Sequence, residues 1–353
     1  MAELRRVEIA GRPVGDGCPV YVIAEAGSNH DRKLEQAFRL IDVAAEAGAD
    51  AVKFQTYSAE ELYSRRTPTM TYLRRAGLVR NGETVWDLIK RIELPREWHA
   101  DLAAYCREKK IHFLSTPFDL RAVDELDAVG CPAYKIASYE LLHVPLLRRV
   151  ARTGKPVILS TGMASLGDIE AAIATIESAG NSQIVLLHCA INYPARLEDV
   201  NLRAMTTMRQ AFQRPVGFSD HTAGITADIA AVALGACAIE KHYTLDRKLS
   251  GPDHPFAIEP DELAAMVRGI RECEAVLGSP IKGRTAAEEE MYRLGRRSLV
   301  AARAIPKGTR ITEDMIAVKR PGFGISPLFM DIVVGRTAQR DIEEDEVLTW
   351  ELV

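Results

Sequence analysis

The chain has 353 residues, of which 47% are hydrophobic and 27% are charged, a composition typical of a globular protein with a large core. The net charge of −4 excludes the strongly basic character by which proteins bind nucleic acids or anionic membranes, so we expect neither partner.

The N-terminal stretch, MAELRRVEIAGRPVGDG, lacks the apolar segment of a secretory signal. No apolar run approaches the roughly 18 residues that span a bilayer. We therefore expect a cytoplasmic protein. The six cysteines form no CxxC pair or zinc-type cluster, which favours reduced, buried thiols.

Apolar strand-like runs alternate with helical patterns through the first three quarters of the chain, as in a parallel sheet wrapped by helices. No G-x-G-x-x-G follows the first run, and eight strands favour a closed (β/α)8 barrel, which takes roughly 250 residues. We therefore predict a TIM barrel domain at residues 1–278. Its candidate strands are Val20–Ala26, Ala51–Gln55, His112–Thr116, Ala133–Ser138, Val157–Thr161, Ile184–Cys189, Val216–Ser219 and Ala238–His242.

Helical patterns fill the gaps between these strands, for example at Leu34–Ala47, at Ile225–Gly235 and from Pro260 to about Leu277. A long insertion, Ser58–Glu93, follows the second strand, where such loops often form a lid or a specificity element. Solvated charge is the alternative for this insertion, because it carries Arg65, Arg66, Arg74, Arg75 and Arg80.

The character of the chain changes after Gly278. Residues 279–295 are charged and partly helical in pattern, which predicts a linker. Residues 296–353 contain three short strand-like pieces, Ser298–Ala302, Gly308–Ile311 and Ile316–Arg320, separated by turns. We predict a small C-terminal module that leans on another surface, because so few residues bury little area.

Two predicted strands of the barrel end in histidine, in the motifs Ser219-Asp220-His221 and Glu240-Lys241-His242. Parallel strands joined by a right-handed crossover present their carboxyl ends at one edge, so both imidazoles should lie close together. Two histidines with Glu25 or Asp253 nearby suit a divalent transition ion such as Mn²⁺, Zn²⁺ or Fe²⁺. The sequence therefore predicts a metal site at this edge.

Two lysines, Lys53 and Lys135, lie inside otherwise apolar strands, where an unpaired ammonium group costs several kcal/mol. With nearby hydroxyls they would form a pocket for a phosphate and a carboxylate. An internal ion pair with Glu25 or Glu140 is the alternative. The hydroxyls belong to Thr116, Ser138, Ser160 and Ser219.

The motifs of the chain resemble those of the sialic acid synthases (N-acetylneuraminate synthases) and their relatives for legionaminic and pseudaminic acid. The matching stretches are AEAGSNH, GADAVKFQT, LSTPFD, YKIAS, ILSTGMAS, LHCAINYPA, GFSDHT, IEKHYTLD and GPDHPFAIEPDEL. The tail, RRSLVAARAIPKGTRITEDMIAVKRPG, resembles the antifreeze-like (SAF) domain that ends those enzymes.

The resemblance implies a TIM barrel with a C-terminal SAF domain, arranged as a homodimer in which the SAF domains are swapped. It also implies condensation of phosphoenolpyruvate with an N-acetylated hexosamine, with a divalent metal, usually Mn²⁺. N-acetylmannosamine, giving N-acetylneuraminate, is the first candidate for the sugar. The alternative is a 2,4-diacetamido-trideoxyhexose, giving legionaminic or pseudaminic acid.

The resemblance also implies residue roles. His221 and His242 would hold the metal, with Glu25 beside it, and Glu25 or Glu140 would carry protons. Arg320 would reach across the dimer to the N-acetyl group of the sugar. Lys53, Thr116, Lys135, Ser138, Ser160 and Ser219 would hold phosphoenolpyruvate, and Gln55, Glu140, Tyr193 and Asp253 would surround the sugar.

One position departs from the family pattern, since Ile191 stands where the family commonly has Asn, Thr or Ser, and Asn192 follows it. Two other functions stay open. A metal-dependent aldolase or hydrolase would use the histidines but not the lysine pocket, and a binding protein would use the C-terminal module alone on ice or glycans.

Overall fold

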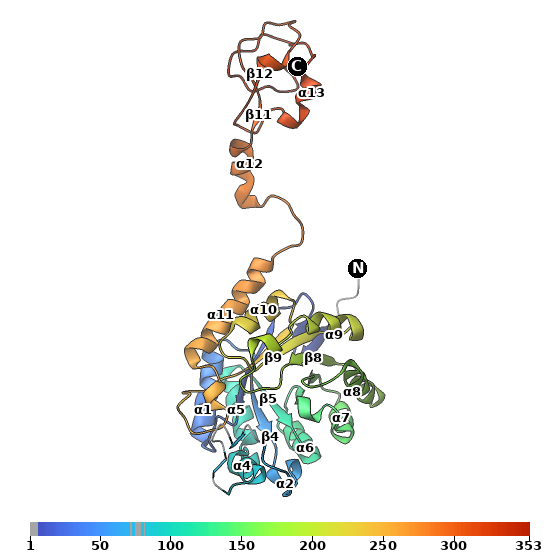
Figure 1. Ribbon diagram of the computed structural model, residues 1–353, viewed down its shortest axis with the longest axis vertical. Coiled ribbons are helices and arrows are strands. Elements are labelled where there is room, and N and C mark those ends of the chain that lie inside the picture. Colours follow the sequence, from blue (N-terminus) through green and yellow to red (C-terminus); the bar gives the residue numbers. More distant parts are fainter. Residues whose placement is uncertain (1–5, 71–72, 75–78, 81) are drawn as a thin grey trace. The chain divides into compact units, whose positions relative to one another are not determined.

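The structure is a computed structural model that describes residues 6–70, 73–74, 79–80 and 82–353. The chain divides into two compact units, Met1–Gly278 and Ser279–Val353 (Figure 1). None of the described helices is both long enough and apolar enough to cross a lipid bilayer.

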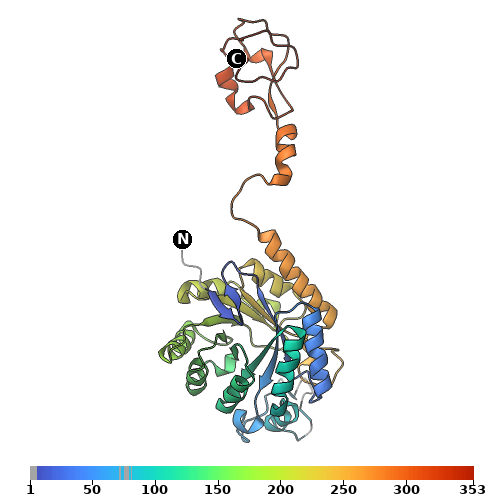
Figure 2. The ribbon, with the colours of Figure 1, turned by 180° about the vertical axis from the view of Figure 1, so that it is seen from behind.

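The first unit is a closed barrel of eight parallel strands surrounded by helices, which confirms the predicted TIM barrel (Figures 1 and 2). Neighbouring strands follow the chain order, and the last strand pairs with the first, with His242 opposite Glu25. The strands are β3 (Tyr21–Gly27), β4 (Ala51–Thr56), β5 (His112–Pro117), β6 (Tyr134–Ile136), β7 (Val157–Ser160), β8 (Ile184–Cys189), β9 (Val216–Asp220) and β10 (Ala238–His242).

The outer helices bury one face on the strands. In the first of them the buried residues Ala37, Leu40, Ile41 and Ala44 recur at the three- and four-residue spacing of an amphipathic helix. The main helices are α1 (Leu34–Glu46), α5 (His99–Lys109), α6 (Leu120–Ala128), α7 (Val144–Ala151), α8 (Leu166–Ser178), α9 (Ala204–Phe212), α10 (Thr226–Ala233) and α11 (Pro260–Leu277).

The described part of the insertion after β4 includes the helices α2 (Ala59–Leu62) and α4 (Val85–Ile92). The second begins with a reciprocal capping box between Thr84 and Asp87. Leu73, Val85 and Leu88 form a small apolar cluster of their own. Arg75, which belongs to the predicted basic set of this insertion, lies outside the described residues.

An antiparallel hairpin that the sequence analysis did not predict precedes the barrel, with strands β1 (Arg6–Ile9) and β2 (Arg12–Gly15). Its turn places Ala10 and Gly11 in the left-handed region, at φ 49° and 81°, which glycine adopts without strain. Val7, Ile9 and Val14 are buried in the main core. The hairpin is therefore part of the barrel unit.

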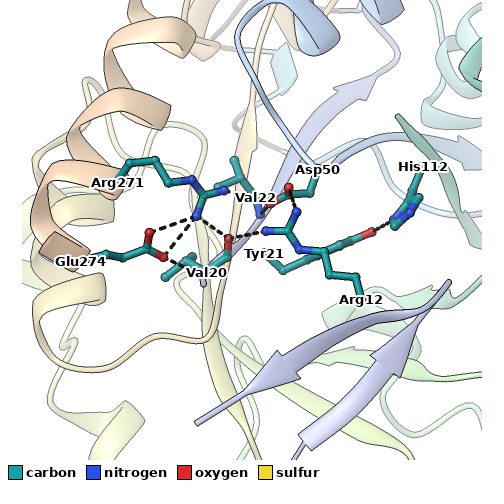
Figure 3. Close-up of polar contacts among 8 residues, drawn as sticks. All are labelled: Arg12, Val20, Tyr21, Val22, Asp50, His112, Arg271 and Glu274. Atoms are coloured by element: carbon teal, nitrogen blue, oxygen red, sulfur yellow. Dashed lines mark hydrogen bonds and ion pairs between the residues drawn. The ribbon is translucent and has the colours of Figure 1, made fainter. Parts of the chain in front are cut away.

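A network of charged residues ties this hairpin to the amino ends of the strands and to the last helix (Figure 3). Asp50, just before β4, forms an ion pair with Arg12 of the hairpin and another with Arg271 of α11, at 3.1 Å. Arg271 also donates to the carbonyl of Val20, at 2.9 Å, while Glu274 accepts from the Val20 amide. The first and last elements of the unit are thereby joined.

The second unit contains a short helix, α12 (Glu289–Gly295), and an antiparallel pair, β11 (Ser298–Ala301) and β12 (Ile316–Lys319), followed by α13 (Met330–Val333). It has its own apolar core, which includes Leu299, Ile311 and Leu348. The predicted strand at Gly308–Ile311 is wrong. The left-handed Gly308 turns the chain there, so only an isolated bridge forms, between Arg310 and Thr337.

Candidate active site at the carboxyl end of the barrel

A cavity of about 50 Å³ lies at the carboxyl ends of the barrel strands. It gathers most of the predicted site residues, which come from all eight strands or the loops that follow them. This is the end of the barrel at which TIM barrel active sites lie. The predicted residues that line it are Glu25, Lys53, Gln55, Thr116, Lys135, Ser138, Ser160, Tyr193, Ser219, His221 and His242.

Strand alternation explains why these residues meet. Side chains two apart on a strand point to the same face, so Lys53 and Gln55 of β4 both line the cavity. The same spacing places Ser219 and His221 on the cavity side, the latter just after β9 ends.

Lys53 is buried and forms an ion pair with Glu25, whose Oε2 lies 2.7 Å from its Nζ. It also donates to the hydroxyl of Thr116, at 3.1 Å. Gln55 donates to the other oxygen of Glu25, at 2.7 Å. Lys53 thus forms the internal ion pair that the sequence analysis left open, and it does so at the wall of the cavity.

Glu240 lines the same cavity but was given no role by the sequence analysis. Its carboxylate lies between the two lysines, 3.7 Å from Lys53 Nζ and 3.4 Å from Lys135 Nζ, and it accepts from the Ser219 hydroxyl at 2.9 Å. The signal for it was available in the motif Glu240-Lys241-His242, because Glu240 and His242 share one face of β10.

Burial and neighbouring charges shift the pKa values of these groups. Burial raises the pKa of Glu25 to about 7, although Lys53 acts in the opposite direction. Burial also lowers the pKa of Lys135 below its ordinary value. Burial works to raise the pKa of Glu240, but Lys135 and Lys53 outweigh it and keep that pKa below its ordinary value. The site therefore combines one carboxyl group that titrates near neutrality with one that stays ionised.

The two predicted metal ligands lie side by side, with 5.4 Å between the ring centroids of His221 and His242. The ring of Tyr193 packs on His221 at 4.3 Å and on His242 at 6.0 Å. Burial lowers the pKa of His221 to about 4 and the pKa of His242 well below its ordinary value. Both imidazoles are therefore neutral near pH 7, the form that binds metals.

Hydrogen bonding leaves a nitrogen available on each ring. His221 Nδ1 lies 2.9 Å from the carbonyl oxygen of Ala190, so the proton belongs on Nδ1 and the lone pair on Nε2. His242 Nδ1 is buried and has no hydrogen-bond partner within the described residues. Those residues include no group of three or more His, Cys, Asp or Glu side chains placed to hold a metal. The donors fit a cation that keeps open positions.

Four more buried oxygens in this region have no hydrogen-bond partner in the described part of the chain. Those of Glu25 and Glu240 are ion-paired with Lys53, whereas Ser160 Oγ and Glu140 Oε2 are not. Native proteins pair nearly all buried polar groups, so such atoms concentrated at one place indicate a ligand site. Glu140 is buried and is not among the residues that line the cavity. Burial raises its pKa to about 7, although Lys135 acts in the opposite direction.

A second, larger cavity of about 240 Å³ adjoins the first and shares Gln55, Tyr193 and His242 with it. The insertion predicted to act as a lid or specificity element provides much of its wall. The lining from the insertion is mostly apolar, and its described members are Leu62, Tyr63, Met70, Leu73, Val85, Leu88, Ile89 and Ile92.

Asp253 lies in this second cavity, where its carboxylate accepts from the amide and the hydroxyl of Ser28, both at 3.0 Å. A Cβ on Gly27 would lie 2.5 Å from Asp253 Oδ2 and 3.5 Å from His242 Nδ1, so glycine leaves room where the two groups approach. Burial raises the pKa of Asp253.

Two predictions concern residues outside these contacts. Arg320 belongs to the second unit, where it donates to the carbonyl of Gly295 at 2.7 Å, and its reach to a sugar stays a prediction. Ile191 lines the smaller cavity, where a Cβ on Gly162 would lie 2.4 Å from it, whereas Asn192 is not among the lining residues. The apolar Ile191 side chain therefore occupies the position expected to be polar.

The fold and the site together define a (β/α)8 barrel with two buried lysines and a histidine pair at the carboxyl ends of its strands. The NeuB family model matches residues 40–282, and the SAF domain model matches residues 296–353. The chain belongs to the NeuB family and carries a C-terminal SAF domain, as the resemblance predicted.

Similar proteins cover nearly the whole chain. The spore coat polysaccharide biosynthesis protein SpsE of Bacillus subtilis is 45% identical, over 98% of this chain and 96% of that protein. The N,N'-diacetyllegionaminic acid synthase of Campylobacter jejuni is 41% identical, over 93% and 98%. The crystal structure of the N-acetylneuraminic acid synthetase of Leptospira borgpetersenii serovar Hardjo-bovis matches with a TM-score of 0.73 and 35% identity, over 82% and 96%.

Proposed function

We propose that the chain is a nonulosonic acid synthase, which condenses phosphoenolpyruvate with an N-acetylated aldose and releases phosphate. The observation that carries this proposal is the cavity in which two buried lysines lie beside a pair of neutral histidines. The names of the similar synthases support the proposal. N-acetylmannosamine is the first candidate for the aldose.

The lysines and hydroxyls would hold phosphoenolpyruvate. Lys53 and Lys135 supply positive charge, and Thr116, Ser138 and Ser160 supply hydroxyls at the same wall. Ser160 Oγ has no hydrogen-bond partner among the described residues, so a bound phosphate or carboxylate would give it one. Holding both reactants in attack geometry provides much of the rate enhancement in such condensations.

His221 and His242 would hold a divalent cation, Mn²⁺ first, which supplies Lewis acidity for the aldehyde oxygen of the sugar. The neutral state of both rings supports this assignment.

The reaction then balances as follows. The methylene carbon of phosphoenolpyruvate forms a bond to the aldehyde carbon, water adds to its C2, and phosphate leaves by cleavage of the carbon–oxygen bond. Of the two protons of the water, one goes to the aldehyde oxygen, which becomes a hydroxyl. The other leaves the new C2 hydroxyl for the departing phosphate as that oxygen becomes the keto oxygen. Glu25 and Glu140, each with a pKa raised to about 7, can accept or donate these protons near neutral pH.

A second candidate sugar is a 2,4-diacetamido-trideoxyhexose, which would give legionaminic or pseudaminic acid. The apolar lining of the larger cavity favours it, because a methyl group and a second acetyl group bury more apolar surface than hydroxyls do. Leu73, Val85 and Leu88 provide part of that lining.

The swapped dimer is also a proposal. It would bring Arg320 of one subunit to the sugar bound by another. The cytoplasmic location stays a prediction.

The test is a panel of N-acetylated aldoses supplied with phosphoenolpyruvate and Mn²⁺, with phosphate release and product mass as readouts. We expect phosphate release only when phosphoenolpyruvate, one of the sugars and the metal are all present. Phosphate release without a sugar would indicate a hydrolase, and turnover of a sugar without phosphoenolpyruvate would indicate an aldolase.

A variant pair sharpens this test. His242→Ala should abolish metal-dependent phosphate release while the protein stays folded. His112→Gln is the control, since His112 bonds the Tyr21 hydroxyl at 2.7 Å at the other end of the barrel (Figure 3). Undiminished turnover by His242→Ala would refute the assignment of the histidine pair.

A further inference from the structure

The strands that carry His221 and His242 also carry charged residues on their opposite face. Asp220 of β9 precedes His221, and Lys241 of β10 precedes His242, so alternation directs both away from the cavity. The two are register partners on the paired strands. Neither is among the residues that line the cavity.

Lys241 is almost completely buried, with 1% of its surface exposed, and three groups surround its ammonium. It forms an ion pair with Asp220, donates to the carbonyl of Thr222 at 2.8 Å, and lies 3.5 Å from Asp228 Oδ2 of α10. Thr222 directly follows His221. A side chain of β10 thereby holds the backbone next to the histidine of the neighbouring strand.

Asp220 fixes the same stretch from its own strand. Its two oxygens accept from the amide of Thr222, at 2.8 Å, and from the Thr222 hydroxyl, at 3.0 Å. The backbone carbonyl of His221 in turn accepts from Ala195, at 2.8 Å. The peptide group between His221 and Thr222 is therefore bound at both its carbonyl and its amide.

Asp228 completes the group and is fully buried in α10. Its carboxyl group interacts with the side chains of both Lys241 and Asp220, and its Oδ2 lies 3.5 Å from Lys241 Nζ. Burial raises the pKa of Asp228 well above its ordinary value, and the Asp220 carboxylate adds to that effect. Lys241 therefore faces two carboxyl groups in the barrel wall, those of Asp220 and Asp228.

Stability alone does not explain three ionisable groups at this place. A buried ion pair is often no more stabilising than apolar residues of the same volume, because desolvation of the charges offsets their attraction. The wall between a barrel strand and its outer helix is ordinarily apolar. Several polar contacts hold the three side chains in one arrangement. Because two of them bind the backbone of Thr222, that arrangement also fixes the position of this backbone.

We propose that Lys241, Asp220 and Asp228 form a positioning group that sets the separation and orientation of His221 and His242 for the metal. The proposal rests on the proposed function of the histidine pair. The three residues touch neither the cavity nor its ligands. They act through the backbone of Thr222 and through the register of β9 against β10.

The experiment measures Mn²⁺ binding by isothermal titration calorimetry on the purified full-length protein, with no substrate present. Lys241→Met removes the ammonium and keeps an unbranched side chain of similar length. We expect it to weaken Mn²⁺ binding by about tenfold, which is the lower range for residues that orient metal ligands. The KM for phosphoenolpyruvate should stay unchanged, since Lys53 and Lys135 lie on other strands.

A double variant guards against a failure to fold. Lys241→Met leaves the Asp220 carboxylate buried without its cation, whereas Lys241→Met/Asp220→Asn removes both charges and should fold. It should also bind Mn²⁺ about tenfold more weakly than the wild type.

Asp50→Asn is the matched control, because Asp50 belongs to a charged network at the other end of the barrel. It should lower the melting temperature and leave Mn²⁺ affinity unchanged. Wild-type Mn²⁺ affinity in the folded double variant would overturn the positioning role, and so would an equal loss of affinity in Asp50→Asn. A wild-type protein that binds no Mn²⁺ would instead overturn the proposed metal site itself, and with it the role of the group toward the metal.

Discussion

The two ends of the barrel differ in how completely their buried polar side chains are hydrogen-bonded. At the amino end, both oxygens of Asp50 are bound, one by Arg12 and the other by Arg271 and the Val22 amide (Figure 3). At the carboxyl end, Ser160 Oγ and His242 Nδ1 are buried without partners among the described residues. The polar groups at the amino end are thus paired within the protein, whereas two of those at the carboxyl end are left unpaired.

Whether a buried polar group has its hydrogen-bond partners within the protein distinguishes structural groups from ligand-binding groups better than residue type does. A buried group whose hydrogen bonds are complete contributes to stability or costs little, whereas an unpaired one costs roughly 1 to 3 kcal/mol. The amino end should therefore respond to mutation mainly through stability, and the carboxyl end mainly through binding and turnover. The predictions below follow from that contrast.

The largest effect is expected for Lys135→Met, which removes an ammonium from the wall of the smaller cavity. The kcat/KM for phosphoenolpyruvate should fall by roughly a hundredfold to a thousandfold, as for loss of one preorganised charged donor. Lys155→Met is the control, since Lys155 pairs with Asp127 just before β7 at the other end of the barrel. An equal loss in both variants would contradict the contrast between the ends.

Glu140→Gln should change how stability depends on pH. Burial raises the pKa of Glu140 to about 7, above its ordinary value of 4.5, so the native state binds a proton that the unfolded state has lost. The wild type therefore loses stability as pH rises from about 4.5 through 7, by up to roughly 3 kcal/mol from this group.

Glutamine cannot ionise, so the variant does not lose this stability. The free energy of unfolding of the variant minus that of the wild type should therefore increase across this range and become constant above it. Urea unfolding at several pH values measures the gap between the two proteins. A gap that is constant from pH 4.5 to 8 would show that Glu140 titrates normally in the folded state.

At the amino end, Asp50→Ala should lower the free energy of unfolding by roughly 2 kcal/mol, because it leaves two arginines and the Val22 amide without their acceptor. The loss is smaller than for a fully buried pair, since the Arg12 and Arg271 side chains are 31% and 33% exposed. Steady-state kinetics below the melting temperature should be those of the wild type. A changed KM for phosphoenolpyruvate would contradict this prediction, because it would show that the network at the amino end influences the site at the carboxyl end.

The smallest effect is expected for Ser160→Ala. Its hydroxyl makes no hydrogen bond within the described residues, so thermal unfolding should be unchanged or slightly later than in the wild type. The KM for phosphoenolpyruvate should rise by about tenfold, as for loss of one hydrogen bond to a charged ligand. A loss of stability without any change in KM would place the hydroxyl among the structural groups.

The sequence predicted the barrel well because its strands are short apolar runs that carry their own signal. Both ends of every barrel strand lie within two residues of the predicted positions. The predicted bounds of β10 (Ala238–His242) match the structure at both ends. The site followed from the same pattern, since residues such as Lys53 and His221 fall at the carboxyl ends of parallel strands. The position of each residue along its strand was thus sufficient to predict most of the residues that line the cavity.

Contacts between distant segments were not predictable in this way. The pairing of Arg12 with Asp50 and of Asp50 with Arg271 depends on the closure of the barrel, which brings residues more than 200 positions apart together. The hairpin at Arg6–Gly15 has strands of only four residues, too short for a clear alternation. Glu240 was missed because its neighbour His242 offered a stronger chemical signal in the same motif.

Contacts between the first and the last segments of the barrel unit also have a consequence for folding during synthesis. The Val20 amide binds Glu274, 254 positions later, and β3 pairs with β10. During synthesis β3 therefore emerges from the ribosome long before the strand and helix that complete it. Closure of the barrel has to wait for β10, and until then β3 presents an unpaired strand edge to neighbouring nascent chains.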